Sequence, residues 1–192
     1  MQEAKLSVFS PAYWRNARAE FRNIRVLAFA GLVCAMAIVL EGLPIYLLGP
    51  SLKIYFSFLV VGLGCMCYGP CVGMMAGAII DSVGFLLSSY GEPYFPGYLV
   101  TAVLSGFIYG VLLYKRKPTL LRIIVVRLII NYGSNVLGSV WKAMLYGKGY
   151  LYYLTSGAIK NTLMLPVEVF LMWAVLNAAV NYGLDRKYIH KR

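Results

Sequence analysis

Residues 157–173 read GAIKNTLMLPVEVFLMW, an apolar run that nevertheless contains a lysine, an asparagine, a proline and a glutamate. With the apolar residues that follow, it reaches the length of about twenty residues that a helix needs to cross a bilayer. Polar groups are costly in lipid and face protein or a cavity instead. The segment therefore predicts a spanning helix whose polar face serves a structural or functional purpose.

The rest of the chain repeats this apolar character. Of its 192 residues, 60% are hydrophobic and 13% are charged, whereas soluble domains are about 25% charged. The sequence predicts an all-α integral membrane protein with six transmembrane helices in a single compact domain. The predicted helices are Val26–Leu48, Ile54–Tyr68, Cys71–Leu87, Tyr98–Tyr114, Leu120–Leu145 and Ile159–Ala179.

The net charge of +11 is distributed unevenly over these helices. Fourteen of the eighteen lysines and arginines fall on one side of a six-helix topology. The positive-inside rule makes that side cytoplasmic, with both termini inside, and this placement argues against a nucleic-acid partner. The fourteen are Lys5, Arg15, Arg18, Arg22, Arg25, Lys115, Arg116, Lys117, Arg122, Arg127, Arg186, Lys187, Lys191 and Arg192.

We expect residues 1–23 to form a cytoplasmic or interfacial segment, residues 24–184 the six-helix membrane domain, and residues 185–192 a basic cytoplasmic tail. The first segment has two interpretations. It forms either an amphipathic surface helix with Tyr13, Trp14 and Phe21 toward lipid, or a solvated leader.

The sequence contains no recognisable catalytic or nucleotide-binding motif of the common types. The single histidine, His190, lies in the tail, and no phosphate-binding loop or serine–histidine pair is present. We expect no metal, and we expect Cys34, Cys65, Cys67 and Cys71 to be small buried residues. The protein is predicted not to be an enzyme, and any concentrative transport needs energy from an ion gradient or another subunit.

Small residues recur every four positions in several helices, which lets helices approach closely. The rows are Gly31 and Ala35; Gly69, Gly73 and Gly77; and Ala102, Gly106 and Gly110. Most are expected to serve packing within the chain. The row on the first helix is the candidate for contact with a partner.

The outer side is predicted to carry the remaining four cations, Lys53, Lys142, Lys148 and Lys160, among aromatic residues. The aromatic residues include Tyr94, Phe95, Trp141 and Tyr146. An interfacial aromatic belt accounts for the rings alone. Rings interleaved with cations also suit a flat anionic ligand.

Polar residues share one face of the fifth helix. Asn131, Asn135, Gly138 and Lys142 are spaced by 4, 3 and 4 residues, which aligns them on a helix. Arg127 continues this stripe inward and Tyr146 continues it outward. A wall that lines a ligand site is the favoured interpretation.

In the sixth helix, Glu168 lies about 12 Å deeper than Lys160 at about 1.5 Å per residue. Pro166 is expected to bend the helix, and Asn135 is expected at the depth of Glu168. Glu168 either accepts hydrogen bonds from a heterocycle or holds helices together with Asn135, and both roles remain open. Glu41 is expected to bond to Lys53 or another outer group.

The segments YGPCVGMMAGAIIDSVGFLL, PYFPGYLVTAVLSGFIYGVLLYKRK, LYGKGYLYYL and IKNTLMLPVEVFL together resemble the S components of energy-coupling factor (ECF) vitamin transporters. The folate-specific group is the most similar, and the resemblance runs from about Arg25 to Leu176.

This resemblance implies a six-helix subunit in the plasma membrane of a prokaryote that binds a vitamin from the outer side. It also implies a transmembrane coupling subunit and two cytoplasmic ATPases as partners, which use the ATP, so that the chain needs no cofactor. In the family, small residues of the first helix contact the coupling subunit, and the matching residues here are Ala30, Gly31, Cys34 and Ala35.

Folate is the expected ligand. Trp141, Tyr94 and Phe95 are predicted to clamp its rings, and Asn131, Asn135 and Glu168 to read its hydrogen-bonding edges. Its carboxylates are predicted to meet Lys142, Lys148, Lys160 or Lys53, and Tyr146 is expected among the substrate-binding residues as well. The alternatives are another vitamin, such as pantothenate or hydroxymethylpyrimidine, or a self-sufficient carrier.

Overall fold

The computed structural model describes residues 10–43, 45–46, 53–88, 94–147 and 149–183. In this part of the chain, five helices are long and apolar enough to cross a membrane, which confirms the predicted all-helical membrane fold. In order, the elements are α1 (Pro11–Ala19), a 3-10 turn η1 (Glu20–Arg22), α2 (Ile24–Glu41), β1 (Ile45–Tyr46), β2 (Lys53–Ile54), α3 (Ser57–Ser88), α4 (Pro96–Leu113), α5 (Leu120–Tyr146) and α6 (Tyr150–Asn181). The two short strands pair antiparallel.

Helix α3 consists of two legs that run in opposite directions. At the junction, Gly69 has φ 78° and ψ −173°, a conformation that favours glycine, and Pro70 follows it. A Cβ atom built on Gly73 would lie 3.1 Å from the Sγ atom of Cys65, although residues eight apart on a straight helix are about 12 Å apart. The legs correspond to the predicted helices Ile54–Tyr68 and Cys71–Leu87.

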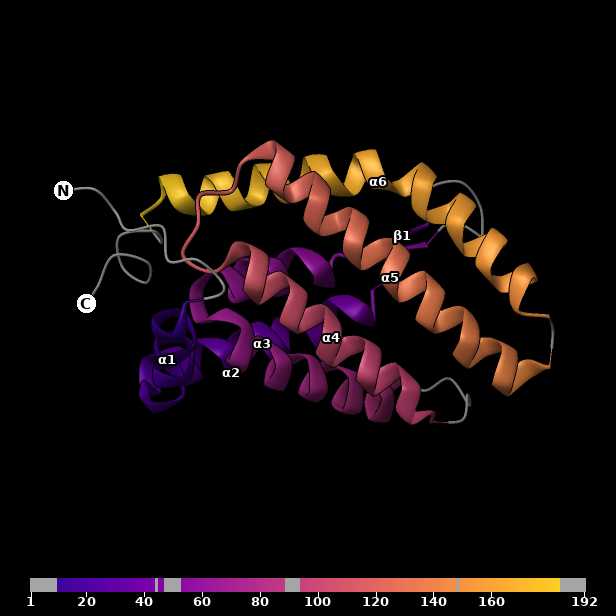
Figure 1. The fold of residues 1–192 in the computed structure, drawn as a ribbon, viewed down its shortest axis with the longest axis horizontal. Coiled ribbons are helices and arrows are strands. Elements are labelled where there is room, and N and C mark those ends of the chain that lie inside the picture. Colours follow the sequence, from indigo (N-terminus) through magenta and orange to yellow (C-terminus); the bar gives the residue numbers. More distant parts are fainter. Residues whose placement is uncertain (1–9, 44, 47–52, 89–93, 148, 184–192) are drawn as a thin grey trace.

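Two predicted helix boundaries are wrong. Helix α2 ends at Glu41 instead of Leu48, because Gly42 caps it and the following Leu43 precedes a proline, which disfavours helical backbone. Helix α6 begins at Tyr150 instead of Ile159, so that only a short turn with Gly147 in the left-handed conformation separates it from α5. As predicted from Pro166, α6 changes direction part-way along its length (Figure 1).

Two of the three predicted small-residue rows join α3 to α4. A Cβ atom on Gly73 would lie 2.7 Å from the Gly106 carbonyl oxygen, and one on Gly77 would lie 2.5 Å from that of Ala102. A Cβ atom on Gly106 would overlap the carbonyl of Gly73 in turn. The two backbones are therefore in direct contact, as expected for helices that associate by close packing in lipid.

We expect Gly106→Ala to destabilise the protein by about 1–3 kcal/mol, because the added methyl group forces α3 and α4 apart. The control is Gly133→Ala on α5, where a Cβ atom would meet nothing within 4 Å. Denaturation of the purified protein in detergent measures both variants. A Gly106 variant as stable as the Gly133 variant would contradict the close contact.

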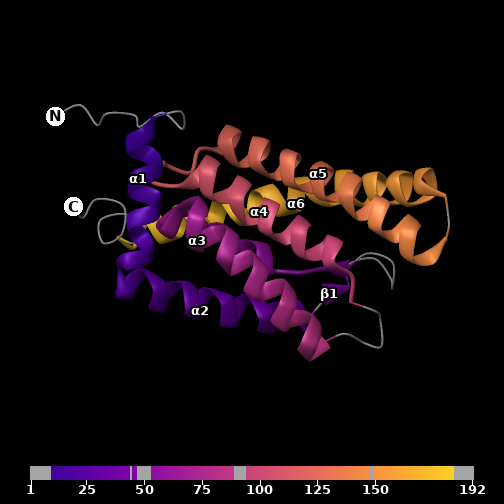
Figure 2. The same cartoon turned by 60° about the horizontal axis from the view of Figure 1, so that its bottom comes forward.

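The short helix α1 crosses the end of the bundle (Figure 2). The Tyr13 hydroxyl donates to the carbonyl of Gly110 at 3.2 Å, and the Tyr13 ring packs edge-on against Tyr114. Trp14 stacks on Phe107 with ring centroids 6.0 Å apart. The predicted helix exists, but the expectation that Tyr13 faces lipid is wrong, because its ring is buried among protein side chains.

Polar contacts hold the same end together. Glu20 pairs with Lys115 at 3.3 Å and accepts a hydrogen bond from the Tyr114 hydroxyl at 2.8 Å. Burial raises the pKa of Tyr13 to about 12, and burial together with Glu20 raises the pKa of Tyr114 above its usual range. Both phenols therefore remain protonated donors at neutral pH.

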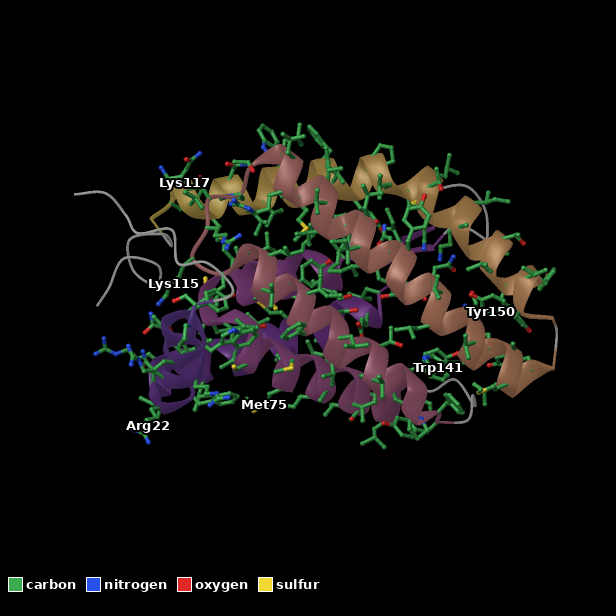
Figure 3. The ribbon with its side chains drawn as sticks, viewed as in Figure 1. Arg22, Met75, Lys115, Lys117, Trp141 and Tyr150 are labelled. Atoms are coloured by element: carbon green, nitrogen blue, oxygen red, sulfur yellow. The ribbon has the colours of Figure 1, made fainter. Side chains whose placement is uncertain are left out.

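The two ends of the molecule differ in chemistry. Figure 3 places Arg22, Lys115 and Lys117 at the end that carries α1, and Trp141 and Tyr150 at the opposite end. The chain enters and leaves the bundle at the basic end (Figure 1). The aromatic outer cluster of the sequence analysis is thus separated from the basic end by the length of the bundle.

Candidate functional site

Hydrogen bonds between polar side chains join α5 to α6. The Asn131 side chain donates to Glu168 at 2.6 Å, and the Asn161 side chain donates to the Asn131 carbonyl at 2.9 Å. The predicted contact of Asn135 with Glu168 is wrong, since Asn135 donates to the Leu154 carbonyl at 3.1 Å. The polar faces predicted for both helices therefore meet, with Asn131 in the place expected of Asn135.

Gly157 makes room for Asn135 in this interface. A Cβ atom on Gly157 would overlap the Oδ1 atom of Asn135. Because the hydrogen bond to Leu154 fixes that side chain, any larger residue at position 157 must break the bond or separate the helices. Asn135 thus already has a structural role in the protein.

Arg127 is the centre of a buried polar network. Its side chain is 4% exposed and forms an ion pair with Glu168, while its Nη1 atom donates to the Tyr109 hydroxyl at 2.6 Å. The guanidinium lies 4.2 Å from the centroid of the Phe58 ring, an arrangement typical of a cation–π contact. Four chain segments, α3, α4, α5 and α6, therefore converge on one cation.

This position corrects the sequence analysis, which counted Arg127 among the cations flanking the cytoplasmic junction. The residue lies inside α5, seven positions after the helix begins at Leu120. Its Nε atom is buried and makes no hydrogen bond within the described residues. Glu168 joins α6 to α5 through Arg127 and Asn131, and its role toward a ligand stays a prediction.

The predicted outer aromatic residues form two groups. Phe95 and Trp141 lie together with ring centroids 5.6 Å apart, and the Trp141 indole donates to Thr101 at 3.1 Å. A Cβ atom on Gly97 would lie 2.5 Å from the Trp141 ring, so the cluster closes over this glycine. Tyr94 contacts Phe85 of α3 instead, at 5.0 Å.

The predicted outer cations are less completely described. Lys142 is exposed, as is Tyr146 near the end of α5, and Lys160 is partly buried. Lys148 lies outside the described residues, and the Lys53 side chain is also outside them, although its backbone pairs with Tyr46. The ligand-binding role of these residues stays a prediction.

A cavity of about 230 Å³ lies between α2, α3, α4 and α5. Glu41 and Ser57 line it at the ends of α2 and α3, and Tyr109 and Arg127 line it deeper in the bundle. The sequence analysis did not assign this cavity. Its remaining lining residues are Phe58, Val61, Gly77, Ile80, Ala102, Ser105, Gly106 and Ile130.

One signal in the sequence pointed to part of this cavity. Arg127 falls on the polar stripe of α5, four residues before Asn131, and a cation on the same face as buried amides is expected inside the bundle. The other lining residues are small or apolar and resemble ordinary core residues.

Comparison with known proteins places the chain in a family. The family model described as "ECF transporter, substrate-specific component" matches residues 25–184. The chain belongs to the family of ECF substrate-specific components. This confirms the resemblance inferred from the sequence motifs, and it makes the protein a membrane transport component and not an enzyme.

Two relatives of this S component are named Folate transporter FolT. The protein of Clostridium novyi (strain NT) is 28% identical over 125 residues, which are 65% of this chain and 72% of the relative. The protein of Leuconostoc mesenteroides is 31% identical over 139 residues, which are 67% and 73%. A solved structure, "Crystal structure of FolT bound with folic acid", superposes with a TM-score of 0.72 at 28% identity, covering 81% of this chain and 95% of that one.

The four residues of this S component expected to contact a partner lie on two faces of α2. Ala30 is 3% exposed and Cys34 is 5% exposed, and the Cys34 sulfur lies 3.9 Å from the Ala76 carbonyl oxygen. Gly31 and Ala35 are exposed, and a Cβ atom on Gly31 would meet nothing within 4 Å. Only the second pair is accessible on the described surface.

Proposed function

We propose that this S component captures folate from the outer side of the prokaryotic plasma membrane and delivers it inward. The observation that carries the proposal is the superposition on FolT bound with folic acid, which covers 95% of that chain. The two relatives named as folate transporters support the same vitamin. The Phe95–Trp141 pair supports it as well, because aromatic ring faces suit a flat ligand.

The proposed topology has six crossings with both termini in the cytoplasm. The two legs of α3 supply two crossings, and α2, α4, α5 and α6 supply the others. The basic residues beside α1 support the cytoplasmic assignment of that end, through the positive-inside rule. Within this arrangement, residues 24–184 form the binding domain, and residues 1–23 and 185–192 are cytoplasmic segments.

We further propose that transport requires a transmembrane coupling subunit and two ATPases, as the family relationship implies. The chain has no phosphate-binding loop of its own. The exposed pair Gly31 and Ala35 is the proposed contact with the coupling subunit, because small residues permit the close approach of another helix.

The proposed ligand path follows α4 and α5 outward. The order along α4 from the inside is Tyr109, Ser105, Thr101 and Gly97. The first two residues line the cavity and the last two lie beside Trp141, so the proposed path runs along this row. Lys142 follows Trp141 and is exposed, in a suitable place for a carboxylate of the ligand tail.

Calorimetric titration of the purified protein with folate, 5-formyltetrahydrofolate and pantothenate tests the vitamin. Folate is expected to bind below micromolar concentration. Absence of folate binding together with tight pantothenate binding would assign the site to pantothenate. Uptake by this chain alone in liposomes would contradict the dependence on ATPase partners.

We expect Trp141→Ala to weaken folate binding by about 2 kcal/mol or more, since aromatic anchors dominate binding free energies. The same titration measures the change. The matched control is Trp173→Ala on α6, because the Trp173 ring is 40% exposed and contacts Phe170 rather than the outer cluster. Equal affinities for folate in both variants would exclude Trp141 from the site.

A further inference from the structure

The helix α1 and the turn η1 that follows it expose three arginines on one face. Arg15, Arg18 and Arg22 are spaced by 3 and 4 residues, and all three are exposed, so helical geometry aligns them. Tyr13 and Ala17 lie on the other face and are buried. The arginines are therefore turned away from the bundle, whereas the Tyr13 ring is fixed by its contacts with α4.

The contacts of α1 with α4 indicate its depth in the membrane. Tyr13 donates to the carbonyl of Gly110, and Trp14 stacks on Phe107, about two turns before α4 ends at Leu113. With 18 residues, α4 is about 27 Å long, slightly less than a hydrocarbon core of about 30 Å. The last turns of a spanning helix of this length lie at the membrane boundary, so α1 beside them is at the level of the lipid headgroups.

The orientation of α1 is also that of a helix at a membrane surface. It crosses the end of the bundle, transverse to the long helices (Figure 2). Apolar side chains are exposed near the arginines, since Phe21 is 39% exposed and Ile24, at the start of α2, is 80% exposed. Cations next to exposed apolar side chains are typical of helices that contact headgroups and the adjoining acyl chains. This combination favours a lipid surface over an acidic protein as the partner.

The charge of the arginine face is not balanced by the described carboxylates. At this end of the bundle, Glu20 pairs with Lys115 at 3.3 Å. The other described ion pair joins Arg127 to Glu168 inside the bundle. Neither pair includes an arginine of α1 or η1, so the charge of this face is available to a ligand from outside the described chain.

A lipid phosphate diester has the charge and the acceptors that these arginines suit. A guanidinium group donates two parallel N–H groups to a pair of phosphate oxygens. Zwitterionic lipids carry the same phosphate, but an ammonium group in the same headgroup cancels its charge. Three arginines on one face therefore favour anionic phospholipids, which keep a net negative charge.

We propose that Arg15, Arg18 and Arg22 bind the phosphate groups of anionic phospholipids in the leaflet at the basic end of the bundle. In the proposed topology this is the cytoplasmic leaflet, whose negative surface potential attracts basic segments beside transmembrane helices. The site is independent of the proposed folate function. The docked aromatic face of α1 holds the arginines at a fixed depth, and bound lipid anchors this end of the subunit at the membrane surface.

Native mass spectrometry of the full chain in detergent, titrated with phosphatidylglycerol or with phosphatidylcholine, tests the proposal. The parent protein is expected to bind phosphatidylglycerol at least about tenfold more tightly. The variant Arg15→Gln/Arg18→Gln/Arg22→Gln should lose at least about fivefold of this preference, which is the contribution of roughly one cation near an anionic surface. The variant Arg15→Lys/Arg18→Lys/Arg22→Lys keeps the charge and should retain most of the preference, reduced by the loss of bidentate bonds.

The matched control is Lys142→Gln/Lys148→Gln/Lys160→Gln, which removes three cations from the predicted outer side. It should keep the preference for phosphatidylglycerol. An equal loss in this control would show that net charge sets the preference, and would overturn the site. Denaturation checks that the glutamine variant of α1 and η1 is folded, and little change is expected because all three positions are exposed.

Two further outcomes would contradict the proposal. Equal affinity of the parent protein for the two lipids would exclude a site for anionic headgroups, and an undiminished preference in the glutamine variant would place the site elsewhere. If the parent shows no preference and the glutamine variant no longer co-purifies with the coupling subunit or the ATPases, the arginine face binds an acidic protein surface instead of lipid.

Discussion

Arg127→Met is expected to lower the free energy of unfolding by about 3–5 kcal/mol, because it leaves the Glu168 carboxylate buried without its cation. The side chains of Arg127 and Glu168 are 4% and 15% exposed, so water replaces little of what is lost. The variant also loses the hydrogen bond to Tyr109 and the contact with the Phe58 ring. Equilibrium denaturation in mixed micelles measures the change.

Arg122→Met is the matched control for this experiment. Arg122 also lies on α5 and donates to the Lys117 carbonyl, but this bond is exposed and the residue is only partly buried. Substitutions at the surface usually change stability by no more than about 0.5 kcal/mol. In the double variant Arg127→Met/Glu168→Gln, no charge remains unpaired, and most of the stability should return. A double variant no more stable than Arg127→Met would show that the ion pair is not the cause.

Gly31→Leu/Ala35→Leu is expected to abolish folate uptake in cells that contain the coupling subunit and ATPases, while folate binding by the purified subunit stays unchanged. Both positions are exposed on α2 and lie apart from the cavity lining. Each added side chain obstructs a close helix contact at a cost of about 1–3 kcal/mol. Together they should weaken association at least about tenfold.

Uptake of labelled folate and co-purification with the coupling subunit measure this effect. Gly133→Leu is the control, because Gly133 is an equally open glycine on α5, and it should retain both. Ala30 lies on the buried face of the same helix and cannot serve the same test, since a larger residue there would disturb the core. Normal uptake by the double leucine variant would place the partner elsewhere.

The helices could be predicted from the sequence because long apolar runs have few other structures available to them in this composition. The start of α6 could not, since residues 150–158 combine tyrosines, a serine and a glycine that also suit an interfacial loop. The reversal at Gly69 was predictable as a boundary. How sharply the chain reverses there could not be predicted, because this depends on glycine contacts between α3 and α4.

The candidate site shows a similar division. Helical periodicity places Asn131 and Glu168 on faces that turn inward, and the structure confirms that these faces meet. Periodicity does not determine how far one helix is shifted along another, which is why Asn131 rather than Asn135 meets Glu168. The sequence analysis also counted Arg127 among the cytoplasmic cations, because it lies near the predicted start of the fifth helix. Its buried position depends on partners from α3 and α4, which the sequence does not reveal.

The docking of helix α1 against the end of α4 has a consequence for the order in which the protein assembles. Tyr13 and Glu20 bind to residues that lie 97 and 94 positions later in the chain. The first helix therefore leaves the ribosome long before its binding surface on α4 has been synthesised and inserted. The final docking of α1 therefore reports that the helices up to α4 have assembled.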